Sequence, residues 1–340
     1  MKNIKPWLMI ECIVLAVLLV LAILVCVDLP AISQLNEPVK DTISLQGGTP
    51  TNPTPTQPDP TEPPTEPEPT WPQLPADRQL TAQQAFVYDV AAGEFTYLKG
   101  GKEDRVYPAS ITKLFTAYVA LQYLEPSQQI TAGDVLDLVG AGSSVAEIQK
   151  GDTLTVEQLV EAMLLPSGND AAYLLADATG RHLTGDNTIS GTAAVRRFLQ
   201  EMNDQAKFLG MNGTQFTNPD GYHSDDHYTT FGDMVIMGKC VLANETIMKY
   251  ASVPEETVQL QKGEVKWENT NELIRPGSQW YCPIATGLKT GQTPSAGSCL
   301  LSSFENEGGK WIIGVFGCPE KDDRFPDTLQ LLNETLKAGA

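Results

Sequence analysis

Apolar residues are most concentrated close to the amino end of the chain. Residues 7–27 read WLMIECIVLAVLLVLAILVCV, in which Glu11 is the one charged side chain. As a helix this run would be roughly 31 Å long, which matches the hydrocarbon core of a bilayer. The run therefore predicts an N-terminal transmembrane helix.

A cleaved signal peptide is the alternative interpretation of the same run. Its apolar stretch is usually shorter, and no small-x-small cleavage site occurs between Val25 and Leu29. Lys2 and Lys5 precede the run and Asp28 follows it, so the positive-inside tendency keeps the amino terminus cytoplasmic. We expect a single-pass protein of the cell membrane whose remaining chain is extracytoplasmic.

A segment without hydrophobic periodicity follows. Residues 49–75 contain eleven prolines and almost no apolar side chains, so they cannot bury a core. This composition favours extended polyproline II chain, which at about 3.1 Å per residue spans roughly 80 Å. We predict three parts: a cytoplasmic stub with the anchor (1–27), a disordered stalk (28–77) and a folded domain (78–340).

The hydrophobic pattern of the third part indicates both strands and helices. Polar and apolar residues alternate over residues 84–90 and 93–100, which predicts a β-hairpin. Apolar positions at helical spacing predict helices over about 109–124, 156–165, 170–179, 192–208, 230–242 and 326–337. Strands are predicted over 265–270, 285–292, 298–305 and 310–318, with a turn at Gly308-Gly309.

Local signals set the ends of two helices. Thr155 and Gln158 form a capping box before the 156–165 run, which Pro166 ends. Gly180 is expected to close the next helix. The order hairpin, helices, strands, helix predicts an α+β fold, most simply one antiparallel sheet flanked by helices, whose first hairpin pairs with the late strands.

Charge narrows the range of functions. The chain has 23 Lys and Arg against 42 Asp and Glu, a net charge of −19, which repels phosphate backbones. We therefore expect no nucleic-acid partner. With 41% hydrophobic residues, a chain of 340 residues has ample material for a sizeable core.

Histidines and cysteines raise the question of a metal site. The stretch from His223 to His227 reads His-Ser-Asp-Asp-His, which is not the His-Glu-x-x-His pattern of zinc proteases, and it follows a turn-like segment. The cysteines of the folded part lack C-x-x-C spacing; they are Cys240, Cys282, Cys299 and Cys318. Disulfide pairing among them stays open, and we expect neither a metal nor a cofactor.

Three short motifs occur in order: Ser110-Ile111-Thr112-Lys113, Ser167-Gly168-Asn169 and Lys289-Thr290-Gly291. The first begins a predicted helix, the second lies between two helices, and the third lies on a predicted strand. Singly, a Ser or Asn in a helix break is usually a cap, and a strand Thr is usually a β-former. The signal comes from the three motifs together in fitting contexts.

The first motif has the geometry of a nucleophile and its base. Ser110 and Lys113 are three positions apart at a helix start, so both side chains lie on one face and the amine reaches the hydroxyl. Lys113 acts as a base only when neutral, and burial together with the nearby cation of Lys289 would lower its pKa. The sequence therefore predicts Ser110 as nucleophile and Lys113 as its general base.

The motifs and their surroundings resemble the penicillin-recognising serine D-alanyl-D-alanine carboxypeptidases, the low-molecular-mass penicillin-binding proteins. The resemblance covers essentially all of residues 80–338 and is carried by YPASITKLFTAYVAL, MLLPSGNDAAYLLAD, FTNPDGYHSDDHYTTFGDM, GLKTGQTPSAGSCLLSS and RFPDTLQLL. It implies a β-lactamase/transpeptidase-like fold and a hydrolase that removes the terminal D-Ala from peptidoglycan stem peptides through a Ser110 acyl-enzyme. Such an enzyme acts in cell-wall biogenesis and is a target of β-lactam antibiotics. We expect the family's C-terminal β-rich domain and amphipathic anchor to be missing, and the N-terminal anchor to replace the amphipathic one.

The resemblance also implies roles around the nucleophile. Ser167 would relay a proton between Lys113 and the leaving amine, and Asn169 would hold the substrate amide. Arg324 either helps to bind the terminal carboxylate or lies at the surface, and both options stay open. His227 belongs to a structural loop near the site.

A second set of roles falls on the third motif. Lys289 and Thr290 would bind the substrate carboxylate by charge and hydrogen bond, and Gly291 would let a peptide approach the strand closely. The backbone N–H groups of Ser110 and Gln292 would form the oxyanion hole.

Two other functions are alternatives. A β-lactamase of this fold needs a carboxylate to activate the deacylating water, and the stretch around Glu201-Met202-Asn203 does not supply the Glu-x-x-x-Asn element. A catalytically silent wall-binding domain needs no reactive dyad, so the intact Ser110, Lys113 and Lys289 argue against it.

Protease added to intact cells with a permeable wall should cut within residues 28–77, because this stretch is exported and buries no backbone. Immunoblots against the two ends of the chain should show a released domain and a short membrane-bound stub. Complete protection in permeable cells, with cutting only after lysis, would show that the orientation is inverted.

Overall fold

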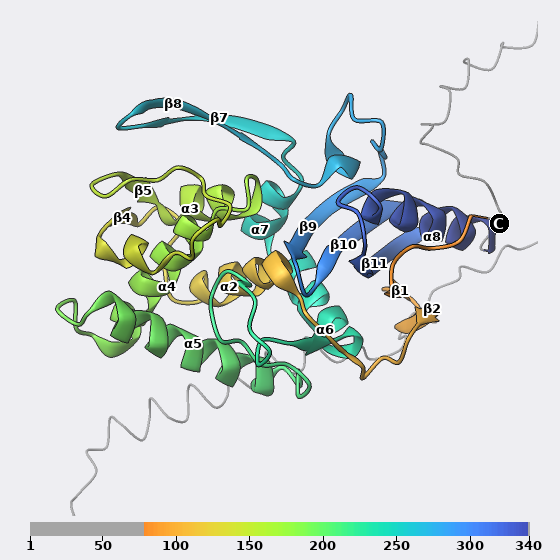
Figure 1. The fold of residues 1–340 in the computed structure, drawn as a ribbon, viewed down its shortest axis with the longest axis horizontal. Coiled ribbons are helices and arrows are strands. Elements are labelled where there is room, and N and C mark those ends of the chain that lie inside the picture. The colour runs from red at the N-terminus through yellow and green to blue at the C-terminus, as the bar shows by residue number, and fades with distance from the viewer. Residues whose placement is uncertain (1–77, 339–340) are drawn as a thin grey trace, which may run out of the picture. The chain divides into compact units, whose positions relative to one another are not determined.

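The computed structural model describes residues 78–338, which are organised around a five-stranded antiparallel sheet (Figure 1). The strands lie in the order β2-β1-β11-β10-β9. Their bounds are β1 Gln84–Asp89, β2 Glu94–Lys99, β9 Ala285–Thr293, β10 Gly297–Asn306 and β11 Gly309–Cys318. β1 lies beside β11, with Val87 opposite Ile313. The predicted α+β fold, with its first hairpin paired to the late strands, is confirmed.

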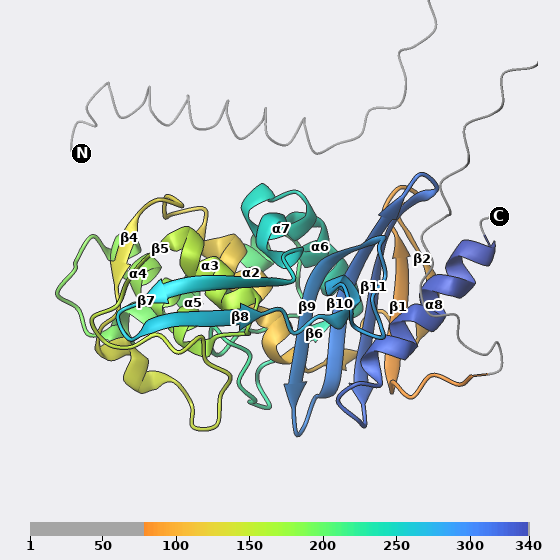
Figure 2. The same cartoon turned by 90° about the horizontal axis from the view of Figure 1, so that it is seen from above.

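The sheet is buried on both faces. On β1, Phe86 packs into a larger core between the sheet and the helices, whereas Val87 packs into a smaller core under α8 (Arg324–Ala338). Successive strand residues point to opposite faces, so both neighbours are buried only when each face has its own cover. Figure 2 shows α8 on one side of the sheet and the other helices on the opposite side.

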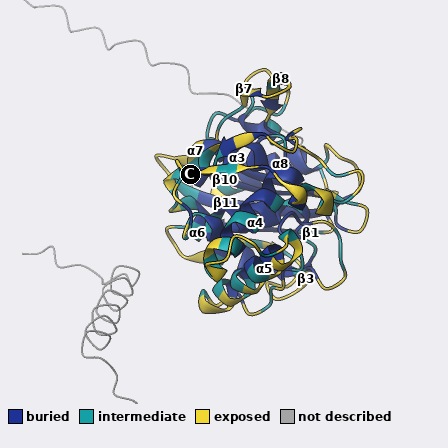
Figure 3. Cartoon of the chain, turned by 90° about the vertical axis from the view of Figure 1, so that its left-hand side faces the viewer, coloured by how far each residue is buried: buried dark blue, intermediate teal, exposed yellow. Residues whose placement is uncertain are grey.

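The remaining helices form a group around α2. They are α2 Thr112–Ala120, α3 Val156–Leu164, α4 Asn169–Thr184, α5 Gly191–Phe208, α6 Phe231–Leu242 and α7 Glu245–Ala251, with 3-10 helices η1 Ala109–Ile111, η2 Asp134–Leu138 and η3 Glu272–Ile274. All α2 residues except Tyr118 are buried, and α2 contacts α3, α4, α5, α6 and α7. Figure 3 shows exposed residues along the outer side of α5. The helix that follows Ser110 is thus held inside the helical group.

Three two-stranded pairs complete the fold. β3 Arg105–Val106 pairs with β6 Thr229–Thr230, β4 Gln129–Thr131 with β5 Thr153–Thr155, and β7 Glu255–Leu260 with β8 Gly263–Glu268. The strand predicted over 265–270 therefore belongs to a separate hairpin. Trp267 is the one buried side chain of β8, so this strand lacks the two apolar faces that the main sheet requires.

The predicted end of a helix at Gly180 is wrong. α4 continues to Thr184, and Gly185, with φ +67°, ends it in the left-handed conformation. Gly180 serves packing instead, because a Cβ there would lie 1.9 Å from the carbonyl oxygen of Ala194 in α5. Close contact between two helices requires the glycine.

Two other helix starts can be compared with the prediction. The capping box of α3 is confirmed: Thr155 Oγ1 accepts from the Gln158 N–H at 3.1 Å, and Gln158 Oε1 accepts from the Thr155 N–H at 2.9 Å. The helix predicted over 109–124 is shorter, since η1 precedes α2 and α2 ends at Ala120. Ala109 has φ +47°, which no continuous α-helix contains.

The predicted transmembrane helix (7–27) and stalk (28–77) lie outside the described residues. Within residues 78–338, no helix has the length and apolar character needed to cross a bilayer. The boundaries of the three predicted parts therefore stay predictions.

Three cysteines of the described chain form no disulfide bond. Cys282, Cys299 and Cys318 are buried free thiols. Burial is the main cause that raises the pKa of Cys299 to about 11 and that of Cys318 to about 12. Neither sulfur is therefore a ready thiolate near neutral pH.

Gly180→Ala should lower the free energy of unfolding by about 1–3 kcal/mol, because the added methyl group collides with the α5 backbone. Helix propensity alone predicts the opposite sign, a gain of roughly 0.5–1 kcal/mol. Gly232→Ala, near the start of α6, is the matched control, since its Cβ would meet its nearest neighbour at an ordinary 3.7 Å. Urea unfolding measures both variants. A stability of Gly180→Ala equal to that of the wild type would contradict the packing role.

Candidate active site

Ser110 lies in η1, one residue after the strained turn at Ala109. Lys113 follows in the first turn of α2, and its Nζ donates a hydrogen bond to Ser110 Oγ at 2.8 Å. The contact predicted from the Ser-x-x-Lys spacing is therefore present. A left-handed φ at a residue with a side chain is uncommon, and here it turns the chain directly before the serine.

Two glycines allow the surrounding backbone to close on this turn. A Cβ on Gly221 would lie 1.9 Å from the carbonyl oxygen of Ala109, and a Cβ on Gly291 would lie 2.7 Å from that of Pro108. From the sequence, Gly291 was expected to let a peptide approach the strand. In the structure, the protein's own turn at 108–110 occupies the space over this glycine.

Burial sets the protonation of Lys113. Its side chain is 0% exposed, and its Nζ also donates to the backbone oxygen of Asp220 at 2.8 Å. Loss of hydration lowers the pKa of Lys113 to about 8, although the charges of Asp220 and Asp170 act in the opposite direction. A substantial fraction of the amine is thus neutral in mildly alkaline water.

Lys289 is the second buried amine. It is also 0% exposed, and its Nζ donates to Thr270 Oγ1 at 3.3 Å and to the backbone oxygen of Thr290 at 3.2 Å. Burial, and then the charges of Lys113 and Arg324, hold the pKa of Lys289 well below its usual range. Burial lowers the pKa of Lys113, as expected. The charge of Lys289 was expected to lower the pKa of Lys113 as well. In the structure it is the charge of Lys113 that lowers the pKa of Lys289.

Ser167 and Asn169 lie in the break between α3 and α4. Ser167 is buried and has φ +64°, and Asn169 is the first residue of α4. The Asn169 N–H donates to the backbone oxygen of Ser144 at 2.8 Å, and the Asp170 carboxylate accepts from the N–H groups of Ala146 and Ile148. The break therefore also holds the loop over 140–148 beside the site.

The β9 motif is fixed from both sides. Thr290 Oγ1 lies 2.6 Å from Thr270 Oγ1, and Arg324 Nη1 donates to the backbone oxygen of Gly291 at 3.3 Å. Arg324 is 3% exposed, so the surface alternative for this residue is wrong. Thr270 belongs to none of the three motifs and could not be predicted from the sequence, because only the fold brings it next to Lys289.

A cavity of about 490 Å³ lies over the serine. Among the predicted residues, Ser110, Asn169 and Gln292 line it, whereas Lys113, Lys289 and Thr290 are buried. The remaining wall comes from segments that the sequence did not single out: 141–144, 220–223 and 293–295. The cavity therefore joins both predicted halves of the site around the Ser110 hydroxyl.

His227 is a structural residue beneath the site. Its Nδ1 accepts from the Thr217 N–H at 3.1 Å, so its Nε2 carries the proton and donates to Thr112 Oγ1 at 2.8 Å. Burial lowers the pKa of His227 to about 4, which keeps the ring neutral. Within residues 78–338 no group of three or more His, Cys, Asp or Glu side chains is placed to hold a metal ion.

These contacts define a class of protein. The serine hydroxyl is hydrogen-bonded to a buried, readily deprotonated lysine, and both lie beside the edge strand of an antiparallel sheet. This arrangement is typical of serine acyl-transfer enzymes with a Ser-x-x-Lys nucleophile. The chain belongs to the D-alanyl-D-alanine carboxypeptidase family, whose model matches residues 70–320. The predicted family is thereby confirmed.

Named relatives agree with this assignment. The D-alanyl-D-alanine carboxypeptidase DacF of Bacillus subtilis is 30% identical over 256 residues, which are 74% of this chain and 61% of that protein. The D-alanyl-D-alanine carboxypeptidase of Streptomyces sp. strain K15 is 30% identical over 266 residues, which are 75% of this chain and 87% of that protein. The match therefore spans about three fifths of the length of DacF.

Solved structures share the fold. The Streptomyces K15 DD-transpeptidase superposes with a TM-score of 0.68 at 28% identity, over 76% of this chain and 98% of that one. Penicillin-binding protein D2 of Listeria monocytogenes, in its ampicillin-bound form, gives a TM-score of 0.60 at 31% identity, over 75% of this chain and 97% of that one. The expected transpeptidase-like fold of the described residues is confirmed.

Proposed function

We propose that the folded domain is a serine-type D-Ala-D-Ala carboxypeptidase, which removes the terminal D-Ala from peptidoglycan stem pentapeptides through an acyl-enzyme on Ser110. The observation that carries this proposal is the 2.8 Å hydrogen bond from the buried Lys113 amine to Ser110 Oγ, at the wall of the 490 Å³ cavity. Membership of the family supports the choice of substrate.

Acylation begins with proton transfer. Neutral Lys113 removes the proton of Ser110, and Oγ attacks the carbonyl carbon between the two D-Ala residues. The N–H groups of Ser110 and Gln292 stabilise the oxyanion, and Ser167 passes the proton from Lys113 to the amine of the leaving D-Ala. Water then attacks the ester carbonyl carbon, and Lys113 transfers a proton from this water to Ser110 Oγ. The shortened peptide leaves, and the free serine is restored.

The other residues orient the substrate. Asn169 binds the amide of the penultimate D-Ala, and Lys289 with Thr290 binds the terminal carboxylate. A carboxylate next to Lys289 favours its charged form, which offsets the burial that lowers the pKa of this lysine in the free protein. Arg324 acts from behind β9 by holding the Gly291 backbone.

The chain would work in the cell wall from outside the membrane. The apolar run over 7–27 would anchor it, and the proline-rich stalk would let the domain reach the stem peptides. β-Lactams would acylate Ser110 as substrate analogues, in keeping with the ampicillin-bound form of the Listeria protein. No cofactor and no nucleic acid takes part.

Penicillin should add its mass to the wild-type protein and not to Ser110→Ala, because only Ser110 Oγ is bonded to the buried amine. Intact-mass spectrometry measures the adduct. Ser224→Ala is a control in the neighbouring loop and should be labelled like the wild type. An equal amount of adduct in Ser110→Ala would contradict the assignment of Ser110 as the nucleophile.

The acylation rate should rise about tenfold per pH unit below pH 8 and level off above it, because only the neutral form of Lys113, with its pKa of about 8, accepts the serine proton. Lys113→Arg, which stays charged, should not acylate at any pH tested. Stopped-flow measurements with a chromogenic cephalosporin give the profile, and Lys150→Arg on the exposed surface should reproduce it. A flat profile between about pH 6 and 9 would rule out Lys113 as the base.

A further inference from the structure

Asp220 is a buried acid beside the base, and its carboxylate has no role in the chemistry described so far. Its side chain is 1% exposed, and Lys113 Nζ donates to its backbone oxygen at 2.8 Å. The same Nζ donates to Ser110 Oγ, so one amine joins the backbone of Asp220 to the nucleophile. Direct hydrogen bonds therefore fix where Asp220 lies relative to the base.

The turn around Asp220 is attached to the helix that carries the lysine. Thr116 Oγ1 in α2 donates to the backbone oxygen of Pro219 at 2.6 Å. Within the turn, the Gly221 N–H donates to Asn218 Oδ1 at 2.7 Å. These contacts hold the acid at its place beside α2.

The Asp220 carboxylate has one satisfied and one unsatisfied oxygen. Oδ1 accepts from the Tyr222 N–H at 3.2 Å, whereas Oδ2 is buried and has no hydrogen-bond partner among residues 78–338. A buried carboxylate is costly when neither water nor a donor compensates its charge. Burial raises the pKa of Asp220, and the charge of Lys113 is the largest of the effects that lower it. The amine is therefore the main compensation for this acid.

The same attraction acts on Lys113 in return. Lys113 and Lys289 are both fully buried, and burial lowers the pKa of each. Asp220 is the first of two acids that oppose this effect on Lys113, whose pKa stays at about 8. The charges that act on Lys289 are positive, and its pKa lies well below its usual range. Two equally buried amines thus differ by the acid beside one of them.

The other ionisable groups around this pair are Asp170 and Tyr173 in α4, His223 and His227 in the loop before α6, and Lys289 in β9. The Asp170 carboxylate accepts from three backbone N–H groups. Burial raises the pKa of Tyr173 to about 12 and lowers that of His227 to about 4, so both are neutral near pH 8. His223 lies 3.4 Å from the Asp225 carboxylate. Asp220 is the acid of this group with an unsatisfied oxygen.

A base in this position needs an intermediate affinity for protons. Lys113 must be neutral to accept the Ser110 proton, but an amine whose pKa is too low would hold that proton too weakly. Burial lowers the proton affinity of Lys113, and a negative charge nearby restores part of it.

We propose that Asp220 is a positioning residue that keeps Lys113 basic enough to deprotonate Ser110. Its backbone oxygen holds Nζ against the serine, and its enclosed carboxylate favours the ammonium form of the lysine. This role rests on the proposed function, because it concerns the acylation of Ser110.

Asp220→Asn keeps an oxygen for the Tyr222 N–H and removes the charge. The midpoint of its acylation profile should fall by about one pH unit from about 8, because the ammonium form of Lys113 loses its attraction. The plateau should fall roughly threefold, because the amine is a weaker base. Stopped-flow measurements on the full chain in detergent, with a chromogenic cephalosporin below saturation, should show the variant faster than the wild type below about pH 7 and slower above about pH 8.

Asp226→Asn is the matched control, because it removes the same charge from an exposed position in the same loop. Its midpoint and plateau should equal those of the wild type. Asp220→Ser, whose hydroxyl can accept from the Tyr222 N–H, is a second uncharged variant and should also move the midpoint to lower pH. A lower plateau at an unchanged midpoint in these Asp220 variants would overturn the proposal, because a purely structural defect has that effect.

A second measurement does not depend on catalysis. In protein labelled with ¹³C at lysine Cε, the Lys113 resonance is identified by its absence in Lys113→Arg, and its titration midpoint should be lower in Asp220→Asn than in the wild type. An unchanged midpoint would overturn the proposal.

This titration also separates the role of Asp220 from the proposed function. Absence of a penicillin adduct in the wild type would defeat the carboxypeptidase assignment, whereas the Lys113 titration would still test the effect of Asp220. Normal labelling of the wild type, with the same midpoint in all Asp220 variants, would defeat the role of Asp220 alone.

Discussion

The chemistry of the active site depends on the burial of one amine, which shields it from water. Lys113 Nζ is fully buried and is bonded to two neutral oxygens, Ser110 Oγ and the backbone oxygen of Asp220, each at 2.8 Å. No carboxylate within residues 78–338 forms an ion pair with it, so burial disfavours its charged form. The α2 helix that carries this lysine is enclosed by five other helices, and the helical group thereby creates the base.

The same enclosure requires backbone segments to approach the serine turn unusually closely. Gly221 and Gly291 allow the loop before α6 and the edge strand β9 to contact Ala109 and Pro108. The neutral His227 ring links this loop to the start of α2 through Thr112. The nucleophile is therefore positioned by the loop before α6 and by β9, as well as by the helix that follows it.

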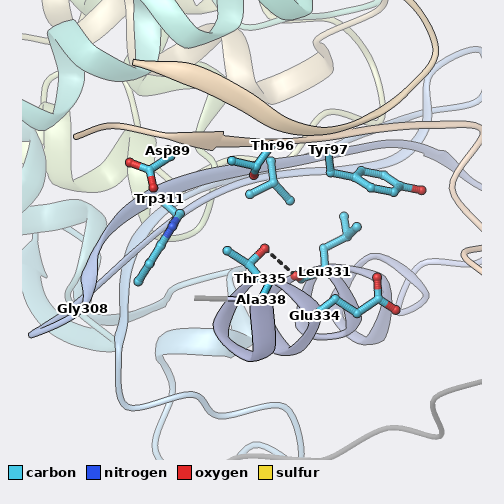
Figure 4. Close-up of a pocket in the computed structure, with 10 residues that line it drawn as sticks. Asp89, Thr96, Tyr97, Gly308, Trp311, Leu331, Glu334, Thr335 and Ala338 are labelled. Atoms are coloured by element: carbon cyan, nitrogen blue, oxygen red, sulfur yellow. Dashed lines mark hydrogen bonds between the residues drawn. The ribbon is translucent and has the colours of Figure 1, made fainter. Parts of the chain in front are cut away.

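The active site lies at one edge of the main sheet. Its β9 edge holds Lys289, Thr290 and Gln292 beside the serine, whereas a separate cavity of about 340 Å³ lies between the β1–β2 hairpin and α8 (Figure 4). The described chain also begins on the α8 side, where Arg78 pairs with the buried Asp327 at 2.6 Å. The beginning of the described chain is thus tied to α8.

The sequence determined the elements and the chemistry that depend on short spacings. The Ser110–Lys113 contact follows from helix geometry, the α3 capping box from Thr155 and Gln158, and the pairing of the first hairpin with the late strands from alternation and order. These features are local, or follow from periodicity, so the residue pattern alone predicts them.

Tertiary structure decided what depends on partners distant in the chain. Gly180 looks like a helix end, and only the backbone of α5 against it shows that it is a packing residue. Arg324 is buried behind Gly291, and Thr270 reaches Lys289, because the fold brings segments from different parts of the chain to one strand.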